Sequence, residues 1–284
     1  MDVRKVGVVG LGTMGAGIAQ VCAQAGFSVV GRELTAELGE AASGRIAGVL
    51  ARGVEKGRLA ASDRDAVLAR IETTTELGDL AGCDLVIEAV VEELDAKRAL
   101  FEELEALVRE DAILATNTSA LSVTAIAAAV GRPERVIGLH FFNPAPVLPL
   151  VEVVQAEHTS PEVLDAATEF VSGLGKEPVR CRDTPGFVVN RILVPLLNDC
   201  VRALDDTGVS PEELDAAMRA GASWPIGPCA LVDLIGVDVQ VRASEALWEA
   251  LREPRLAPPP RLRRMLEAGD LGRKSGRGFY TCPG

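Results

Sequence analysis

The sequence is poor in the features that mark several large classes of protein. It contains no apolar run near the roughly 20 residues that a membrane-spanning helix requires, so no membrane association is expected. Lys and Arg together number 29 against 41 Asp and Glu, and the net charge of −12 argues against nucleic acids and anionic membranes as main partners. The first residues show no signal-peptide pattern, and a cytoplasmic location is therefore expected.

Cysteine is scarce, and its spacing carries no metal-binding pattern. None of the six cysteines forms a C-x-x-C pair, and no histidine cluster accompanies them. We therefore expect neither a metal site nor a disulfide framework, and we expect most of these residues to be small buried hydrophobes. The six positions are Cys22, Cys83, Cys181, Cys200, Cys229 and Cys282.

The length and the order of predicted elements indicate two domains. A chain of 284 residues with 48% hydrophobic content is long enough for about two domains. Apolar strand candidates alternate with amphipathic helix candidates up to Gly186, and helical patterns follow it. The sequence therefore predicts an α/β Rossmann-type doubly wound sheet in residues 1–186 and an all-helical C-terminal domain in residues 187–284.

The expected elements can be given as ranges. The strand candidates are residues 5–10, 28–32, 84–89, 112–116, 135–140, 150–154 and 177–181. Helices are expected after the first strand, over 35–57, 93–109 and 123–130, from Ser160, and over 187–206, 211–220, 237–251 and 260–268. Ser160 is expected to cap its helix, with Pro161 in the first turn, and Ser210, before Pro211-Glu212-Glu213, marks another helix start.

A glycine-rich turn, Gly10-Leu11-Gly12-Thr13-Met14-Gly15, follows the first strand and opens a helix. Such a turn lets the backbone approach a pyrophosphate and directs a helix N-terminus at it, which predicts a dinucleotide cofactor. Glu33, about 20 residues further on, ends the second strand and is placed to bind the ribose hydroxyls, although it would equally serve as a solvated carboxylate. Arg32 would favour a 2′-phosphate, but Glu33 would repel one, so NAD is expected over NADP.

Further candidates follow the strand over residues 84–89. Ligands in open α/β sheets bind beyond the carboxyl ends of the strands, which draws attention to Ala89, Glu92 and Lys97. From the residues alone, Glu92 and Lys97 could equally be solvated helix charges.

The chain has only two histidines, and their surroundings differ. His158 lies in a polar segment and is expected at the surface. His140 ends an apolar strand beside the expected cofactor crevice, where an imidazole suits proton transfer, although a lone histidine is more often a hydrogen-bonded core residue. Glu152 is the only acid in the apolar strand that follows, and it is either the partner of His140 or a solvent-facing residue.

Two polar residues in apolar surroundings complete the candidate site. Ser119, in Asn117-Thr118-Ser119, follows the strand over residues 112–116 and either hydrogen-bonds a substrate oxygen or caps the next helix. Asn190 is an amide in an apolar helix start, where such a group usually has a specific partner.

Seven segments, spread in order along the chain, resemble segments of the L-3-hydroxyacyl-CoA dehydrogenases, especially the bacterial 3-hydroxybutyryl-CoA dehydrogenases. The likeness covers nearly the whole chain. The segments are the glycine turn, Asp84–Ala89, Asn117–Ser119, His140-Phe141-Phe142-Asn143-Pro144, Leu150–Val153, Asp183–Arg191 and Gly272–Tyr280.

The resemblance implies a role for each matching position. It implies NAD-dependent interconversion of a (S)-3-hydroxyacyl-CoA and a 3-oxoacyl-CoA, a reaction of fatty acid metabolism, with His140 as the base and Glu152 as its paired acid. It implies that Ser119 and Asn190 hold the substrate's 3-oxygen, and that Arg52 and Lys56 contact the CoA phosphates. It also implies a homodimer formed through the helical domain. The implied cofactor contacts, besides the glycine turn and Ala89, are Glu33, Glu92, Lys97, Asn117, Ser119, Asn143 and Lys274.

Departures from the family pattern leave alternatives open. Pro149 stands where a basic residue is usual, and Trp224 and Cys229 lie in a part expected to shape the acyl pocket. The acyl chain length and the thioester carrier, CoA or a carrier protein, are therefore undecided. The alternatives are a catalytically silent NAD-binding protein on the same fold and a dehydrogenase of the β-hydroxyacid type, which would use a lysine and lack the His-Phe-Phe-Asn-Pro segment.

Overall fold

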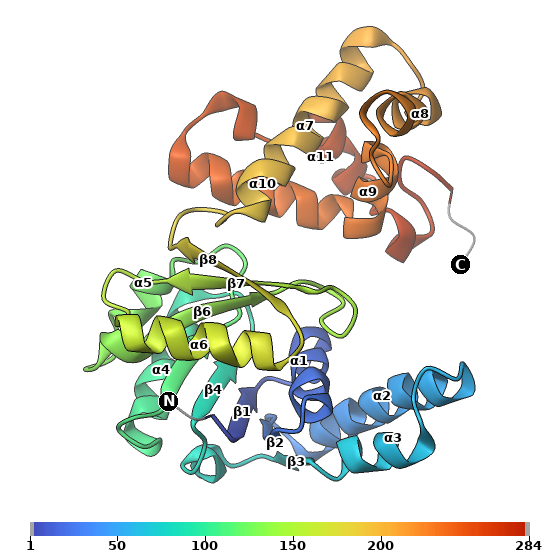
Figure 1. The fold of residues 1–284 in the computed structure, drawn as a ribbon. Coiled ribbons are helices and arrows are strands. Elements are labelled where there is room, and N and C mark those ends of the chain that lie inside the picture. Colours follow the sequence, from blue (N-terminus) through green and yellow to red (C-terminus); the bar gives the residue numbers. More distant parts are fainter. Residues whose placement is uncertain (1–2, 282–284) are drawn as a thin grey trace. The chain divides into compact units, whose positions relative to one another are not determined.

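The computed structural model in Figure 1 describes residues 3–281. The chain divides into two compact units, Met1–Thr184 and Pro185–Gly284, and each encloses its own hydrophobic core.

The first unit is built on one eight-stranded sheet in the order β3-β2-β1-β4-β5-β6-β7-β8. Its central strands β4, β5 and β6 are buried at every position, which explains their almost uninterrupted apolar sequences. The edge strands β3 and β8 are largely exposed and carry polar residues. The strands are β1 (Lys5–Val9), β2 (Ser28–Arg32), β3 (Ile71–Thr74), β4 (Leu85–Glu88), β5 (Ile113–Thr116), β6 (Val136–Phe141), β7 (Leu150–Gln155) and β8 (Glu177–Arg182).

The direction of the strands changes once, between β6 and β7. Strands β1 to β6 are parallel to one another, and β7 pairs antiparallel with β6. The connection from β6 to β7, residues 142–149, contains no helix, and a parallel pair would need a longer crossover. Helix α6 (Pro161–Gly173) supplies such a crossover between β7 and β8, which are parallel.

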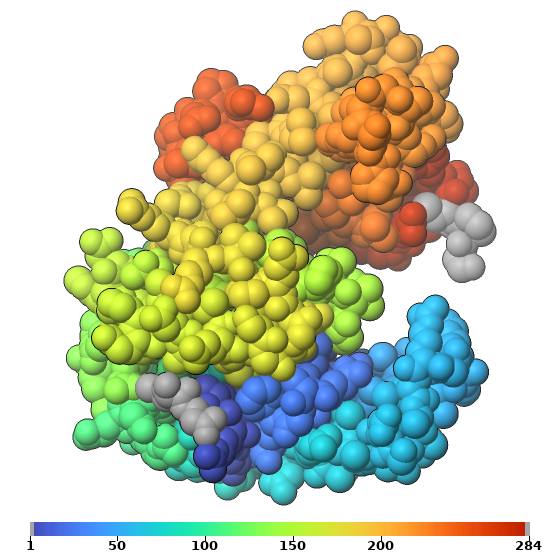
Figure 2. Space-filling model, in the orientation of Figure 1, coloured from blue at the N-terminus to red at the C-terminus, as the bar shows by residue number. Residues whose placement is uncertain are grey.

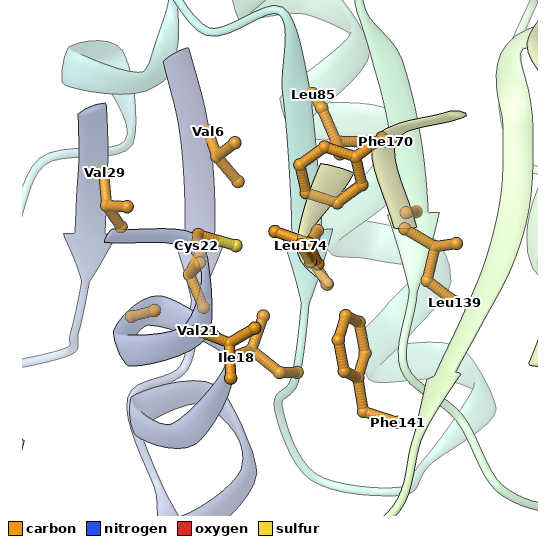
Figure 3. Close-up of a cluster of buried hydrophobic side chains, with 14 of the residues drawn as sticks. Val6, Ile18, Val21, Cys22, Val29, Leu85, Leu139, Phe141, Phe170 and Leu174 are labelled. Atoms are coloured by element: carbon orange, nitrogen blue, oxygen red, sulfur yellow. The ribbon is translucent and has the colours of Figure 1, made fainter. Parts of the chain in front are cut away.

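Helices cover both faces of the sheet. One face packs against α1 (Thr13–Gln24), α2 (Ala36–Glu55) and α6, and Figure 3 shows the strand residues Val6, Leu85 and Leu139 gathered with side chains of α1 and α6. Each fully buried leucine there stabilises the fold by about 1.5–3 kcal/mol. On the opposite face, a Cβ added to Gly138 of β6 would lie 2.9 Å from Val123, which places α5 there. The remaining helices of this unit are α3 (Ala61–Leu68), α4 (Leu94–Leu107) and α5 (Val123–Ala127).

The second unit is helical. A core of Leu197, Val201, Val232, Val237 and neighbouring apolar residues holds its helices together. Gly236, at φ 105°, ends α9 and begins α10 in a backbone conformation that favours glycine. The helices are α7 (Val189–Thr207), α8 (Pro211–Ala222), α9 (Pro228–Ile235), α10 (Val237–Leu251) and α11 (Pro260–Glu267).

The structure confirms the predicted fold class, and each expected strand matches an observed one. The helix starts at Ser160 and Ser210 are also confirmed, with the serine side chain capping the helix in both. Sequence analysis missed β3, α3 and α9. Strand β3 is a polar edge strand, and α9 is apolar around most of its circumference, so neither shows the periodicity that identifies such elements.

Five cysteines lie among the described residues, and all five are free thiols. Four of them are buried, as the sequence led us to expect, whereas Cys181 is half-buried and Cys282 lies outside the described residues. Over residues 3–281, no helix combines the length and the apolar character needed to cross a bilayer.

Asp84 ties the start of β1 to β4, and its ionisation should contribute to stability. Its Oδ2 accepts the backbone N–H groups of Arg4 (2.8 Å) and Lys5 (2.9 Å), and Arg109 lies 3.0 Å from Oδ1. Burial opposes ionisation, but the Lys5 and Arg4 donors and the Arg109 charge outweigh it and hold the pKa of Asp84 below its usual range.

We predict that Asp84→Asn lowers the free energy of unfolding at pH 7 by about 1–3 kcal/mol, measured by urea unfolding. A lowered folded-state pKa stabilises the fold fully above the unfolded-state pKa of about 3.9 and ceases to do so as the pH falls through the folded-state value. The deficit should therefore be constant from pH 7 to about pH 5 and shrink only at lower pH. Glu103→Gln, at an exposed position on α4, is the control. A deficit that vanishes by pH 6 would contradict this account.

Candidate active site

The glycine-rich turn between β1 and α1 has the shape of a phosphate cradle. Gly10 has φ 83°, and a Cβ on Gly15 would lie only 1.7 Å from the carbonyl oxygen of Gly10, so both positions require glycine. A Cβ on Gly12 would meet no atom within 4 Å, so the turn is open at this point. Gly12 is also the N-cap of the twelve-residue helix α1 and offers no capping side chain, which leaves the first-turn N–H groups to a ligand. These features fit the pyrophosphate of a dinucleotide.

Two side chains fix the backbone of Leu11 within this turn. Glu33, directly after β2, accepts the N–H of Leu11 through Oε1 (2.6 Å) and that of Leu34 through Oε2 (3.1 Å). Arg45 of α2 donates to the carbonyl oxygen of Leu11 (2.6 Å). The sequence singled out Glu33 but not Arg45, which carries no local signal because its target is 34 residues away.

A buried ion-pair cluster lies at the end of β4. Lys97 of α4 is 1% exposed, and its Nζ lies 2.5 Å from Glu88 Oε1 and 3.2 Å from Glu92 Oε2. Ala89 continues the β4 backbone, donating its N–H to Val9 (2.8 Å). Sequence analysis named Lys97, Glu92 and Ala89 but missed Glu88, whose signal was a carboxylate at the end of an otherwise apolar strand.

Glu92 connects this cluster to the loop after β5. Its Oε1 accepts the Thr118 hydroxyl (2.6 Å) and the N–H groups of Ser119 (2.9 Å) and Ala120 (3.2 Å). Partial burial opposes ionisation, but Lys97 and the loop donors outweigh it and lower the pKa of Glu92. The Ser119 side chain is exposed, with its Oγ 3.5 Å from Glu92 Oε1.

Asn117 connects the same loop to β6. Its side-chain oxygen accepts the N–H of Phe141 (2.9 Å), and its own N–H donates to the Glu88 carbonyl (2.9 Å). The loop that carries Ser119 is therefore tied to the residue next to His140.

The His140 and Glu152 side chains lie side by side because of strand register. The antiparallel pairing of β6 with β7 sets these residues opposite each other, so their side chains share one face of the sheet. Nδ1 of His140 is 2.7 Å from Oε2 of Glu152, a hydrogen-bonding distance, and both residues are buried. The ring of Phe142 lies against the imidazole, with 4.4 Å between the ring centres. The structure thus brings together the histidine and the carboxylate that the sequence suggested as partners.

The loop after β6 carries Asn143, which is exposed. Lys176 holds this loop by donating to the carbonyl oxygens of Ala145 (2.7 Å) and Leu148 (2.8 Å). Sequence analysis did not identify Lys176, because its partners are backbone groups about 30 residues away.

Arg52 and Lys56 lie in the last turn and C-cap of α2, which Figure 2 shows in light blue on the surface of the first unit. Both side chains are exposed and accessible to a ligand in solution.

The remaining candidates belong to the second unit. Asn190 is half-buried in the first turn of α7, and Lys274 forms an ion pair with Asp238 of α10. Cys229 is fully buried, and Trp224 packs against the helical core of this unit.

Within residues 3–281, no group of three or more His, Cys, Asp or Glu side chains is arranged to hold a metal ion. The site described above consists of the dinucleotide cradle, the His140–Glu152 pair and the polar residues around them.

Comparisons with known proteins agree with this geometry. Residues 5–184 match the NAD-binding domain of the 3-hydroxyacyl-CoA dehydrogenase family, and residues 186–282 match its C-terminal domain. The 3-hydroxybutyryl-CoA dehydrogenase of Mycobacterium tuberculosis is 47% identical over 281 residues, covering 98% of each chain. That of Bradyrhizobium diazoefficiens is 44% identical over 99% of this chain and 96% of its own.

Solved structures show the same likeness. The (S)-3-hydroxybutyryl-CoA dehydrogenase PaaH1 of Ralstonia eutropha is 41% identical and covers 100% of both chains with a TM-score of 0.96. The resemblance stated from the sequence motifs is thereby confirmed. The chain belongs to the 3-hydroxyacyl-CoA dehydrogenase family and is an NAD-dependent oxidoreductase.

Proposed function

We propose that this enzyme interconverts a short-chain (S)-3-hydroxyacyl-CoA, such as 3-hydroxybutyryl-CoA, and the corresponding 3-oxoacyl-CoA. The observation that carries the proposal is the buried His140–Glu152 pair, with 2.7 Å between Nδ1 and Oε2, at the end of the sheet. The relatives described above are named for 3-hydroxybutyryl-CoA, which supports this substrate class.

His140 acts as the general base in the oxidation direction. Because a carboxylate oxygen can only accept, Glu152 holds the imidazole in the tautomer with a proton on Nδ1. Nε2 then takes the proton of the substrate's 3-hydroxyl group and returns it during reduction. Glu152 also stabilises the imidazolium that forms, because a buried cation needs a nearby countercharge.

NAD, when bound, supplies the acceptor for the hydride that leaves C3 of the hydroxyacyl group. The turn from Gly10 to Gly15 would hold its pyrophosphate, and Glu33 would accept the ribose hydroxyls with its remaining lone pairs. Glu33 favours NAD over NADP because a carboxylate at this position repels a 2′-phosphate. We further assign cofactor contacts to Ala89, Glu92, Asn117, Ser119, Asn143 and Lys274.

The proposal assigns four residues to substrate binding. Ser119 and Asn190 hydrogen-bond the 3-oxygen and orient C3. Arg52 and Lys56, exposed at the end of α2, pair with the CoA phosphates and form a local basic patch on an acidic protein.

The proposal assigns NAD binding to residues 1–186, and assigns dimerisation and, through Asn190, part of substrate binding to residues 187–284. Large apolar side chains are exposed in the helical unit, including Ile192 of α7 (62%) and Leu234 of α9 (53%). Such exposure supports a homodimer formed through this unit, since exposed apolar surface often marks an interface.

We predict that the purified protein oxidises NADH with acetoacetyl-CoA, measured as loss of nicotinamide absorbance, and does so faster than with NADPH. His140→Gln should lower kcat by about 10²–10⁴-fold, the range that general acid–base catalysis contributes, while the Kd of NADH changes little. Glutamine is chosen because it can still donate to Glu152, whereas alanine would leave a buried carboxylate without its partner.

Wild-type protein that binds NADH but reduces no 3-oxoacyl-CoA would overturn the proposal in favour of a silent NAD-binding protein. Activity only with the acyl carrier protein thioester would reassign the carrier. Normal turnover by His140→Gln would remove His140 from the mechanism.

Glu152→Gln should retain substrate binding and lose most of its turnover. The glutamine amide can donate to Nδ1 and thereby select the wrong imidazole tautomer, and the analogous change in serine proteases lowers kcat by about 10⁴-fold. We expect kcat to fall by at least about 100-fold with KM within about threefold, measured in steady-state assays. An unchanged kcat would show that Glu152 takes no part in catalysis.

Gly12→Ala tests the cradle. The added methyl group meets no atom of the protein, and φ is −59° at this position, so the variant should fold with an unchanged thermal midpoint. The methyl group would occupy space required by the pyrophosphate, and we expect the Kd of NADH to rise at least about tenfold in fluorescence titrations, a loss of about 1.4 kcal/mol. Unchanged NADH affinity would place the cofactor elsewhere.

A further inference from the structure

We propose that Glu88 and Lys97 are positioning residues that act through Glu92 to fix the loop carrying Ser119. This inference rests on the proposed function, because it concerns how the substrate-binding hydroxyl of Ser119 is placed. It gives Lys97 a task in addition to the cofactor contact that the family resemblance implies.

The Glu88 carboxylate is the immobile member of this network. It is the last residue of β4 and is fully buried, and its carboxylate accepts the Thr116 hydroxyl (2.8 Å) and the N–H of Val90 (2.7 Å). Thr116 lies opposite Glu88 in the register of β4 with β5. The carboxylate is therefore held by two neighbouring strands and by the turn that follows it.

Lys97 connects the Glu88 carboxylate to the Glu92 carboxylate. Its ammonium group contacts both carboxylates, and its side chain is 1% exposed, against 38% for Glu92. An ammonium group with so little accessible surface has its charge balanced by the two carboxylates that it contacts. It is well placed to act as the countercharge that binds a mobile carboxylate to an immobile one.

The two carboxylate oxygens of Glu92 therefore have different partners. Oε2 faces Lys97, and Oε1 accepts all the donors from the loop at Thr118, Ser119 and Ala120. Lys97 thus determines which oxygen is presented to the loop and in which direction. The buried Thr118 hydroxyl extends the contact by accepting the N–H of Leu121 (2.9 Å).

A second carboxylate holds the far end of the same loop. Asp183, directly after β8, accepts the Ser122 hydroxyl (2.7 Å) and the N–H of Thr124 (2.8 Å). The exposed hydroxyl of Ser119 therefore stands on a short segment anchored on both sides. Loss of the Glu92 anchor should let Ser119 move without unfolding the loop.

The test is a double-mutant cycle between Lys97→Met and Ser119→Ala, assayed with NADH and acetoacetyl-CoA. Misplacement of a group by about 1 Å can cost about 100-fold in rate, so we expect Lys97→Met to lower kcat by about that factor. In the Ser119→Ala background the same change should cost less than about threefold, because the group it positions is already absent. The Kd of NADH should rise by much less than kcat falls, because Glu92 and Ser119 are only two of the assigned cofactor contacts, and all parameters of Glu102→Gln, an exposed control on α4, should stay within about threefold of wild type.

A second variant separates positioning from folding. Lys97→Met alone leaves Glu88 buried without a countercharge, whereas Glu88→Gln with Lys97→Met removes both buried charges. We expect the double variant to regain most of the lost thermal midpoint while kcat remains low.

Recovery of kcat together with the thermal midpoint would overturn the proposal, because Lys97 would then serve the fold alone. Additive losses in the cycle would also overturn it, as would a rise in the Kd of NADH as large as the fall in kcat. A wild-type protein inactive on every 3-oxoacyl thioester would instead refute the proposed function, and Ser119→Ala at full activity would remove Ser119 from it.

Discussion

The reversal of strand direction between β6 and β7 is the constraint on which the proposed chemistry depends. Because the connecting segment is too short for a crossover, β7 returns alongside β6 and pairs with it antiparallel. That register sets Glu152 opposite His140, on strands whose backbones are fixed by neighbouring pairs. A slip of one residue would turn Glu152 to the other face of the sheet, which is packed with apolar side chains. Rigid strands therefore hold the two groups at hydrogen-bonding distance more accurately than loops would.

The buried carboxylates of this region are likewise held by strands. Glu88 and Glu152 are both fully buried in strands, and each has a basic or ring nitrogen within hydrogen-bonding distance. A buried carboxylate without a partner would be strongly unfavourable, so these contacts hold the surrounding side chains in place. The network starts at Glu88, passes through Lys97 and Glu92 to the Ser119 loop, and Asn117 joins that loop to Phe141, beside His140. Polar groups at the carboxyl ends of three central strands are thus connected with one another and with a helix.

The elements that could be predicted are those whose signal is local. The glycine turn, the apolar central strands and the serine caps each follow from a few adjacent residues, and all were found where expected. His140 stood out because the chain has only one other histidine, and that one lies in a polar segment. Arg45 and Lys176 were missed because their partners lie between 28 and 34 residues away in the chain. Strand β3 was missed because its edge position leaves it polar.

The α/β class, the helical second half and the cradle could all be inferred from the amino-acid sequence, because backbone conformation and the pattern of buried residues depend on side chains close together in the chain. The sequence also supplied the chemical groups of the site. Which of these groups come into contact depends on the tertiary structure. The direction of β7, the face that Glu152 shares with His140 and the burial of Lys97 between two carboxylates follow from the packing of the whole sheet and its helices. No short segment carries that information, since a contact between distant residues depends on every element that fixes their positions.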